Sequence, residues 1–267
     1  MITLRFVAAL FIAAVLATAG IVFAHVSSGK HIPASYPLHA PNVTRLPPRI
    51  LWAWERPEDL GTIDPTTTGV AFLARTVFLA GDSVSIRPRL QPLQLAPGTQ
   101  VIAVVRIEVS RGASPSLSSK QLAEAAHAVA AAAQLPGLVG LQIDFDATAS
   151  QRDFYRRLIA QVREEIPADL PLSITALASW CIGDDWLKNL HIDDAVPMLF
   201  RMGAGARDVS LHLQSGGDFR APVCRQSLGI STDERPPNLP PGRRLYIFSP
   251  RAWTSGTVQL ATHMGRP

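Results

Sequence analysis

The residues best suited to chemistry lie in LVGLQIDFDATAS, residues 138–150, where an apolar strand ends in two carboxylates. Side chains along a strand alternate between its two faces, so Gln142, Asp144 and Asp146 share one face, opposite the apolar residues. Two carboxylates this close raise each other's pKa at a cost in free energy, which favours a functional role. Two acids beside a pocket can act as general acid, general base or nucleophile on a glycosidic bond.

Other apolar strands of the sequence also end in polar or aromatic residues. Arg106 and Glu108 share one face of the segment 101–109, and Glu55 closes ILWAWE, with Trp54 on the opposite face. We expect the charged ends to meet where parallel strands terminate together. The candidate catalytic residues are Asp146, Asp144, Glu108 and Glu55. The candidate substrate-binding residues are Trp54, Arg75, Arg106, Trp180 and Arg201. The competing interpretation is a structural network, because buried acids and arginines neutralise one another.

Eight apolar segments alternate with helical or irregular ones and predict the scaffold. They are 50–55, 69–75, 101–109, 138–146, 171–180, 195–203, 225–231 and 244–250. Amphipathic or alanine-rich helices are predicted over 116–135 and 151–166. Continuously apolar strands alternating with helices indicate a parallel sheet covered by helices, and eight strands in this length favour an α/β fold of the (β/α)8 TIM-like barrel type. A doubly wound open sheet is the alternative.

Two proline-rich segments predict departures from a regular barrel. IRPRLQPLQL, residues 86–95, reads as an extended segment at a sheet edge, because proline cannot donate to a strand ladder. TDERPPNLPPGR, residues 232–243, is too short and too rich in proline for a full helix. We therefore expect the barrel to be irregular after its seventh strand.

The N-terminus predicts export from the cytoplasm. Residues 1–24 combine Arg5 with a long apolar stretch that ends in VFA, as a secretory signal peptide does. The same stretch is also long enough for an uncleaved membrane anchor, in which case it contacts the membrane. Residues 25–48 read as a Pro/Ser-rich linker, and 49–267 as the barrel domain. We expect a periplasmic or secreted protein, in one version anchored to the inner membrane.

Composition and cysteine content limit the remaining functional classes. The net charge of +4 is spread along the chain, and no basic stripe is interleaved with aromatic residues, so nucleic acid is not an expected partner. The sequence shows neither a dinucleotide-binding glycine motif nor a phosphate-binding loop, and we predict no cofactor. In an oxidising compartment Cys181 and Cys224 can form one disulfide or remain unpaired.

LQIDFDAT, together with PMLFRMG on a later strand, resembles the chitinase-like glycoside hydrolases. In that family a D-x-x-D-x-D-x-E motif ends the fourth barrel strand, and Asp144 and Asp146 match its last two aspartates. Thr148 stands at the position of the catalytic glutamate, so an acid from another strand, Glu108 or Glu55, would have to take its role. WAWERPEDL, residues 52–60, and IDFD, residues 143–146, are also similar to a bacterial family of exported proteins known only as a domain of unknown function.

Two hypotheses from different classes follow. In the first, an exported barrel binds and hydrolyses a glycan, with Asp146 as proton donor and Asp144 tuning its pKa. Arg106 and Arg201 then orient the substrate, and Trp180 forms a stacking wall. In the second, the barrel is catalytically inactive and serves as an envelope binding or assembly module. A divalent cation held by Asp144, Asp146 and Glu108 is a third alternative. The oligomeric state does not follow from the sequence.

Overall fold

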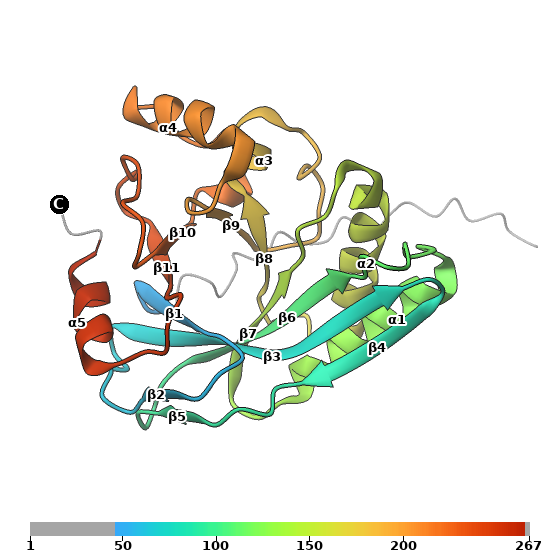
Figure 1. The fold of residues 1–267 in the computed structure, drawn as a ribbon, viewed down its shortest axis with the longest axis horizontal. Coiled ribbons are helices and arrows are strands. Elements are labelled where there is room, and N and C mark those ends of the chain that lie inside the picture. The colour runs from blue at the N-terminus through green and yellow to red at the C-terminus, as the bar shows by residue number, and fades with distance from the viewer. Residues whose placement is uncertain (1–45, 265–267) are drawn as a thin grey trace, which may run out of the picture. The chain divides into compact units, whose positions relative to one another are not determined.

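The computed structural model describes residues 46–264, which form one closed barrel (Figure 1). The eight barrel strands, in order around the barrel, are β1 (Arg49–Ala53), β3 (Thr68–Ala80), β6 (Val101–Val109), β7 (Leu138–Asp144), β8 (Leu172–Leu177), β9 (Asp194–Met198), β10 (Ser227–Ser231) and β11 (Arg244–Phe248). Neighbouring strands pair in parallel, and β1 pairs with both β11 and β3, which closes the sheet. The predicted TIM-like (β/α)8 fold is confirmed, and the open-sheet alternative is wrong.

Helices follow five of the barrel strands within residues 46–264. They are α1 (Ser119–Ala130), α2 (Arg152–Glu165), α3 (Ala178–Gly183), α4 (Ala206–Gln214) and α5 (Ser255–His263). Short 3-10 turns occur at η2 (Ala131–Gln134), η3 (Ala149–Gln151), η4 (Gly203–Gly205) and η5 (Pro222–Cys224). Helices α1 and α2 lie side by side, and α1 also contacts β3 and β4 (Figure 1). Among residues 46–264, no helix is long and apolar enough to cross a membrane.

The barrel is irregular in its first and last parts. Strand β4 (Ser83–Pro88) pairs antiparallel with the end of β3 at the sheet edge, and β5 (Leu93–Leu95) pairs with β2 (Glu58–Leu60) in a small separate sheet. The expected extended edge segment is therefore present, divided into two short strands. No helix forms within 232–243, between β10 and β11, which confirms the irregularity predicted after the seventh strand.

Strand alternation divides the core into an outer and an inner layer. On β7, Leu141 and Ile143 are fully buried in one cluster with the apolar residues of α2, which recur on one face of that helix at helical spacing. Inside the barrel, Ile50 and Trp52 of β1 pack with Tyr246 of β11. Each fully buried Leu or Ile side chain stabilises the fold by about 1.5–3 kcal/mol. These two layers hold the strand ends rigidly enough to position polar side chains.

The expected signal or anchor, residues 1–24, lies outside the described residues. The same holds for the expected linker, 25–48, except for its last three residues, which lead into β1. Export and anchoring therefore stay predictions.

Candidate functional site

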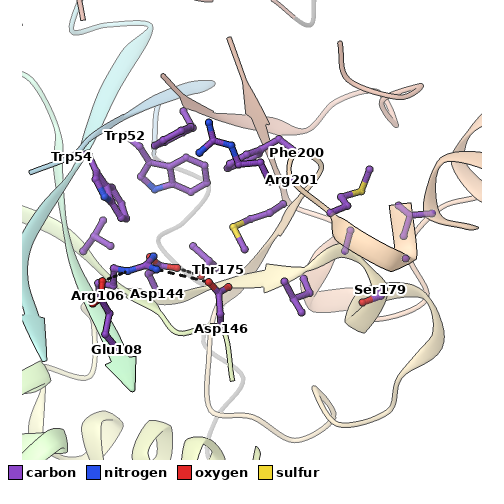
Figure 2. Close-up of a pocket in the computed structure, with 18 residues that line it drawn as sticks. Trp52, Trp54, Arg106, Glu108, Asp144, Asp146, Thr175, Ser179, Phe200 and Arg201 are labelled. Atoms are coloured by element: carbon purple, nitrogen blue, oxygen red, sulfur yellow. Dashed lines mark hydrogen bonds and ion pairs between the residues drawn. The ribbon is translucent and has the colours of Figure 1, made fainter. Parts of the chain in front are cut away.

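A pocket of about 430 Å³ opens where the barrel strands end, at the C-terminal face of the barrel. Barrel enzymes assemble their active sites at this face, from strand ends and the loops that follow them. Its lining combines acids and an arginine from β6 and β7 with aromatic residues from β1, β11 and the segment after β9. In Figure 2 the acids lie on one side of the pocket, and Trp52, Trp54 and Phe200 lie across from them.

Arg106 of β6 organises the acidic side of the pocket. Its Nη1 donates to Asp144 Oδ2 at 2.7 Å, and its Nε donates to Glu108 Oε1 at 2.9 Å. Its Nη2 lies 3.9 Å from Asp146 Oδ2, beyond hydrogen-bond distance. β6 and β7 pair with Arg106 opposite Asp144, so the sheet register itself creates this contact. Three carboxylates therefore converge on one guanidinium group (Figure 2).

The two aspartates of the IDFD segment have different environments. Asp144 is buried, and its second oxygen accepts a hydrogen bond from Thr175 Oγ1 of β8 at 2.7 Å. Asp146 lies just past the end of β7, its side chain is 55% exposed, and it has no side-chain hydrogen bond to any residue within 46–264. Asp144 is thus held in place by its partners, whereas Asp146 keeps oxygen atoms free for a ligand.

The pKa of Asp146 is raised above its ordinary value. Partial burial is the largest cause, and the neighbouring Asp144 carboxylate adds to it, whereas Arg106 lowers the pKa. Burial lowers the pKa of Arg106, but the attraction of Asp144 and its other carboxylate partners outweighs burial, so the net shift is upward. Asp146 therefore stays protonated to a higher pH than an ordinary aspartate, as a proton donor requires.

The opposite side of the pocket is aromatic. Trp54 packs edge-on against Phe248, and Phe248 stacks on Phe200 with ring centroids 5.5 Å apart. Trp52 is held by a hydrogen bond from its Nε1 to the buried Gln142 at 2.8 Å. Flat aromatic faces beside carboxylates suit a ligand that has apolar and polar faces, as a sugar ring does.

Arg201 also lines the pocket, as the sequence predicted. It follows the end of β9 and has a left-handed backbone conformation, φ = 50°. Its guanidinium carbon lies 5.1 Å from the centre of the Phe248 ring, and the group forms ion pairs with Asp233 and Glu234. The arginine thus ties the connection 232–243 to the aromatic wall.

Glu55 and Arg75 were expected at this rim, but the structure places both elsewhere. Trp52 and Trp54 point into the pocket, so Glu55 points to the other side of the chain, where its Oε1 accepts from Leu90 N. Strand β3 has a register shift between Leu73 and Arg75, and such a bulge reverses which face the following residues occupy. Arg75 therefore points outward and donates to Ala128 O of α1.

Trp180 was expected to end a strand and form a stacking wall, and this placement is wrong. Strand β8 ends at Leu177, and the chain turns at once into helix α3. Trp180 lies on that helix, 3% exposed, with its ring centre 4.8 Å from that of Trp186. It belongs to the core outside the barrel.

Several lining residues were not predicted from the sequence, among them Trp52, Thr175, Ser179, Met198, Phe200 and Phe248. Trp52, Thr175, Met198 and Phe248 lie on predicted strands, where the alternation of side chains between the two faces was the available signal. Phe248 lies two residues after Tyr246, which faces the barrel interior. Closure of the barrel decides which strand ends face the same pocket. A local sequence pattern does not predict this.

Cys181 and Cys224 form a disulfide with their Cα atoms 5.9 Å apart. The bond joins helix α3 to the turn η5, so it fixes segments that follow β8 and β9. The sequence left pairing open, and the structure decides it.

The structure gives no support to the divalent-cation alternative. Within residues 46–264, no group of three or more His, Cys, Asp or Glu side chains has an arrangement that could hold a metal ion. Arg106 lies between the carboxylates that the alternative required and takes the place of the cation.

Comparison with known proteins agrees with one expected resemblance. Residues 97–199 match a family described as Domain of unknown function (DUF3142), and this match includes IDFD but not WAWERPEDL. A search of curated proteins gave no match. Among solved structures, the chitinase domain of the spore coat protein CotE from Clostridium difficile is similar, at 15% identity and a TM-score of 0.43. The alignment covers 72% of this chain and 67% of that one.

Proposed function

We propose that the pocket binds a glycan and that Asp146 promotes hydrolysis of a glycosidic bond. The observation that carries the proposal is the arrangement of Asp146, an open carboxyl group of raised pKa, across a cavity from an aromatic wall. A sugar ring stacks its C–H face on Trp54 or Phe248, and its hydroxyl groups reach the carboxylates and Arg106.

In the hydrolytic reaction, Asp146 transfers its proton to the glycosidic oxygen as the bond from that oxygen to the anomeric carbon breaks. Water attacks the anomeric carbon, and Glu108, another carboxylate of the pocket, accepts the proton that water loses. Asp144 and Arg106 are positioning residues, because Asp144 is occupied by Arg106 and Thr175 and acts on Asp146 through its charge.

A binding barrel without catalysis is the second candidate, and Thr148 favours it. This residue stands where the chitinase-like pattern has its glutamate, and the structure uses it as the N-cap of η3. The backbone N–H of Thr148 donates to Gln151 Oε1 at 2.9 Å, which completes a capping box. Thr148 is therefore part of a helix start and does not line the pocket.

Purified protein screened against a panel of envelope and plant glycans tests both candidates. Each glycan is assayed for a shift in melting temperature and for released reducing ends, with Asp146→Asn beside the wild type. Asp82→Asn is the matched control, because Asp82 is an exposed acid in the β3–β4 turn, outside the pocket lining.

Release that is lost in Asp146→Asn and kept in Asp82→Asn supports hydrolysis. A melting shift without release supports the binding barrel. Equal release by wild type and Asp146→Asn removes Asp146 from the mechanism, and the absence of any shift or release across the panel refutes glycan recognition.

A further inference from the structure

The charges around the pocket do not balance. Arg106 is the cation that faces the three pocket carboxylates, Glu108, Asp144 and Asp146. Arg201, the other arginine of the lining, is already paired with Asp233 and Glu234. Two guanidinium groups therefore face five carboxylates in this part of the described structure, and the surplus is negative.

The surplus is concentrated at Asp146. Asp144 has Arg106 and Thr175 as close partners, and Glu108 has Arg106 at 2.9 Å. Asp146 lies 3.9 Å from Arg106, which has its two shorter contacts with the other acids, and the Asp146 side chain is 55% exposed. A cation entering the pocket would find the least satisfied carboxylate there, in a cavity where the field of Asp144 adds to its own.

The aromatic wall restricts which cation fits. A bare metal ion gains nothing from apolar side chains, and an organic cation buries its carbon skeleton against them. The guanidinium carbon of Arg106 lies 5.7 Å from the centre of the Trp54 ring. This side of the pocket therefore already holds a positive charge against an aromatic face. A ring with one apolar face and an ammonium group at its edge suits both sides of the pocket.

We propose that the pocket selects a glycan with free, protonated amino groups, such as a glucosamine oligomer, over its N-acetylated form, and that Asp146 binds the ammonium group. This inference rests on the proposed glycan recognition in its second form, the binding barrel without catalysis, because an ionised Asp146 that holds an ammonium group has no proton to donate. An N-acetyl group is neutral and forms no ion pair with a carboxylate. Acetylation therefore removes the ion pair with Asp146 and leaves the stacking of the sugar ring on the aromatic residues. A charge-assisted hydrogen bond in a partly dehydrated pocket is worth about tenfold or more in affinity.

The test is isothermal titration of the full-length protein with oligomers of glucosamine, N-acetylglucosamine and glucose, of one length and one linkage. The titrations are done at a mildly acidic pH and at two salt concentrations. We expect the glucosamine oligomer to bind about tenfold more tightly than the other two, with an advantage that shrinks at high salt. Asp146→Asn should abolish the advantage of the glucosamine oligomer, whereas Asp82→Asn should preserve it.

Three results would overturn the inference, and they differ from one another. Equal affinity for all three oligomers refutes the amine preference and leaves glycan recognition standing. No binding of any of them removes the proposed function and this inference together. A preference that survives in Asp146→Asn assigns the ammonium group to another residue and refutes the role of Asp146.

Discussion

Asp194 at the start of β9 should make the stability of the fold depend on pH in an unusual direction. The residue is 1% exposed, and Ser227 Oγ donates to its Oδ2 at 2.6 Å. Its Oδ1 is buried and has no hydrogen-bond partner within residues 46–264. Burial raises the pKa of Asp194 to about 7, and neighbouring Asp193 adds to the shift. Ser227, Arg244 and the Ala195 N–H lower the pKa but do not outweigh burial.

The sign and the size of the effect follow from linkage. An ordinary aspartate has a pKa of 3.8, so between about pH 4 and pH 7 the folded protein holds a proton that the unfolded chain releases. The free energy of unfolding should therefore fall as pH rises through this window. A shift of about three pKa units corresponds to about 4 kcal/mol, reached above pH 7.

Asp194→Asn removes the titration and keeps an oxygen that accepts the Ser227 hydrogen bond. The variant should match the wild type below about pH 3, where the aspartate is protonated in both states. It should then gain in relative stability up to about 4 kcal/mol above pH 7. Urea unfolding at several pH values gives the difference curve, in which the other titrating groups cancel. Asp82→Asn, which replaces an exposed acid of the β3–β4 turn, is the matched control.

A difference curve that stays flat for Asp194→Asn would refute the reasoning. A variant that is less stable than the wild type at alkaline pH would show that Asp194 is ionised in the fold and stabilised by Arg244. In that case the unpaired Oδ1 would have to be satisfied in a way that the described residues do not show.

Three further outcomes are expected. Asp144→Asn should lower the pKa of Asp146, because it removes a repelling charge and leaves the attraction of Arg106; a carboxyl NMR titration that shows no change or a rise would contradict this. Replacing Cys181 and Cys224 by alanine should lower the free energy of unfolding by about 4 kcal/mol, because the disulfide closes a loop of 43 residues. An unchanged midpoint of urea unfolding would contradict this expectation. Tyr155→Phe should raise stability by about 1 kcal/mol, because the Tyr155 hydroxyl is fully buried and has no hydrogen-bond partner among residues 46–264; a lower melting temperature would argue that the hydroxyl is satisfied.

The sequence predicted the strands of the barrel more fully than it predicted the site. All eight predicted strands exist, and 101–109 has the bounds that its apolar run indicated. Asp144, Asp146, Arg106 and Glu108 meet at one pocket, because each lies on the inward face at the end of its strand or just beyond it. Glu55, Arg75 and Trp180 do not, and each failure has a local structural cause: the opposite strand face, a bulge, and a strand that ends before the residue.

Local geometry explains what could be predicted from the sequence alone. Apolar runs of strand length and helical periodicity are properties of neighbouring residues, and strand alternation placed Gln142 and Asp144 inside the barrel before any partner was known. The contacts of those residues were not predictable in the same way. Arg106 meets Asp144, 38 positions away, through the register of two parallel strands, and Trp52 reaches Gln142 across 90 positions.

Closure of the barrel settles these long-range contacts. Each strand's register depends on its two neighbours, so the position of every strand end follows from the whole ring of pairings. That ring places the aromatic residues of β1 and β11 across from the acids of β6 and β7, and it leaves Asp146 3.9 Å from Arg106, without a side-chain hydrogen bond to any of the described residues. The sequence supplied the acids and the face they occupy, and the tertiary structure supplied the cavity, the aromatic wall and the unbalanced charge.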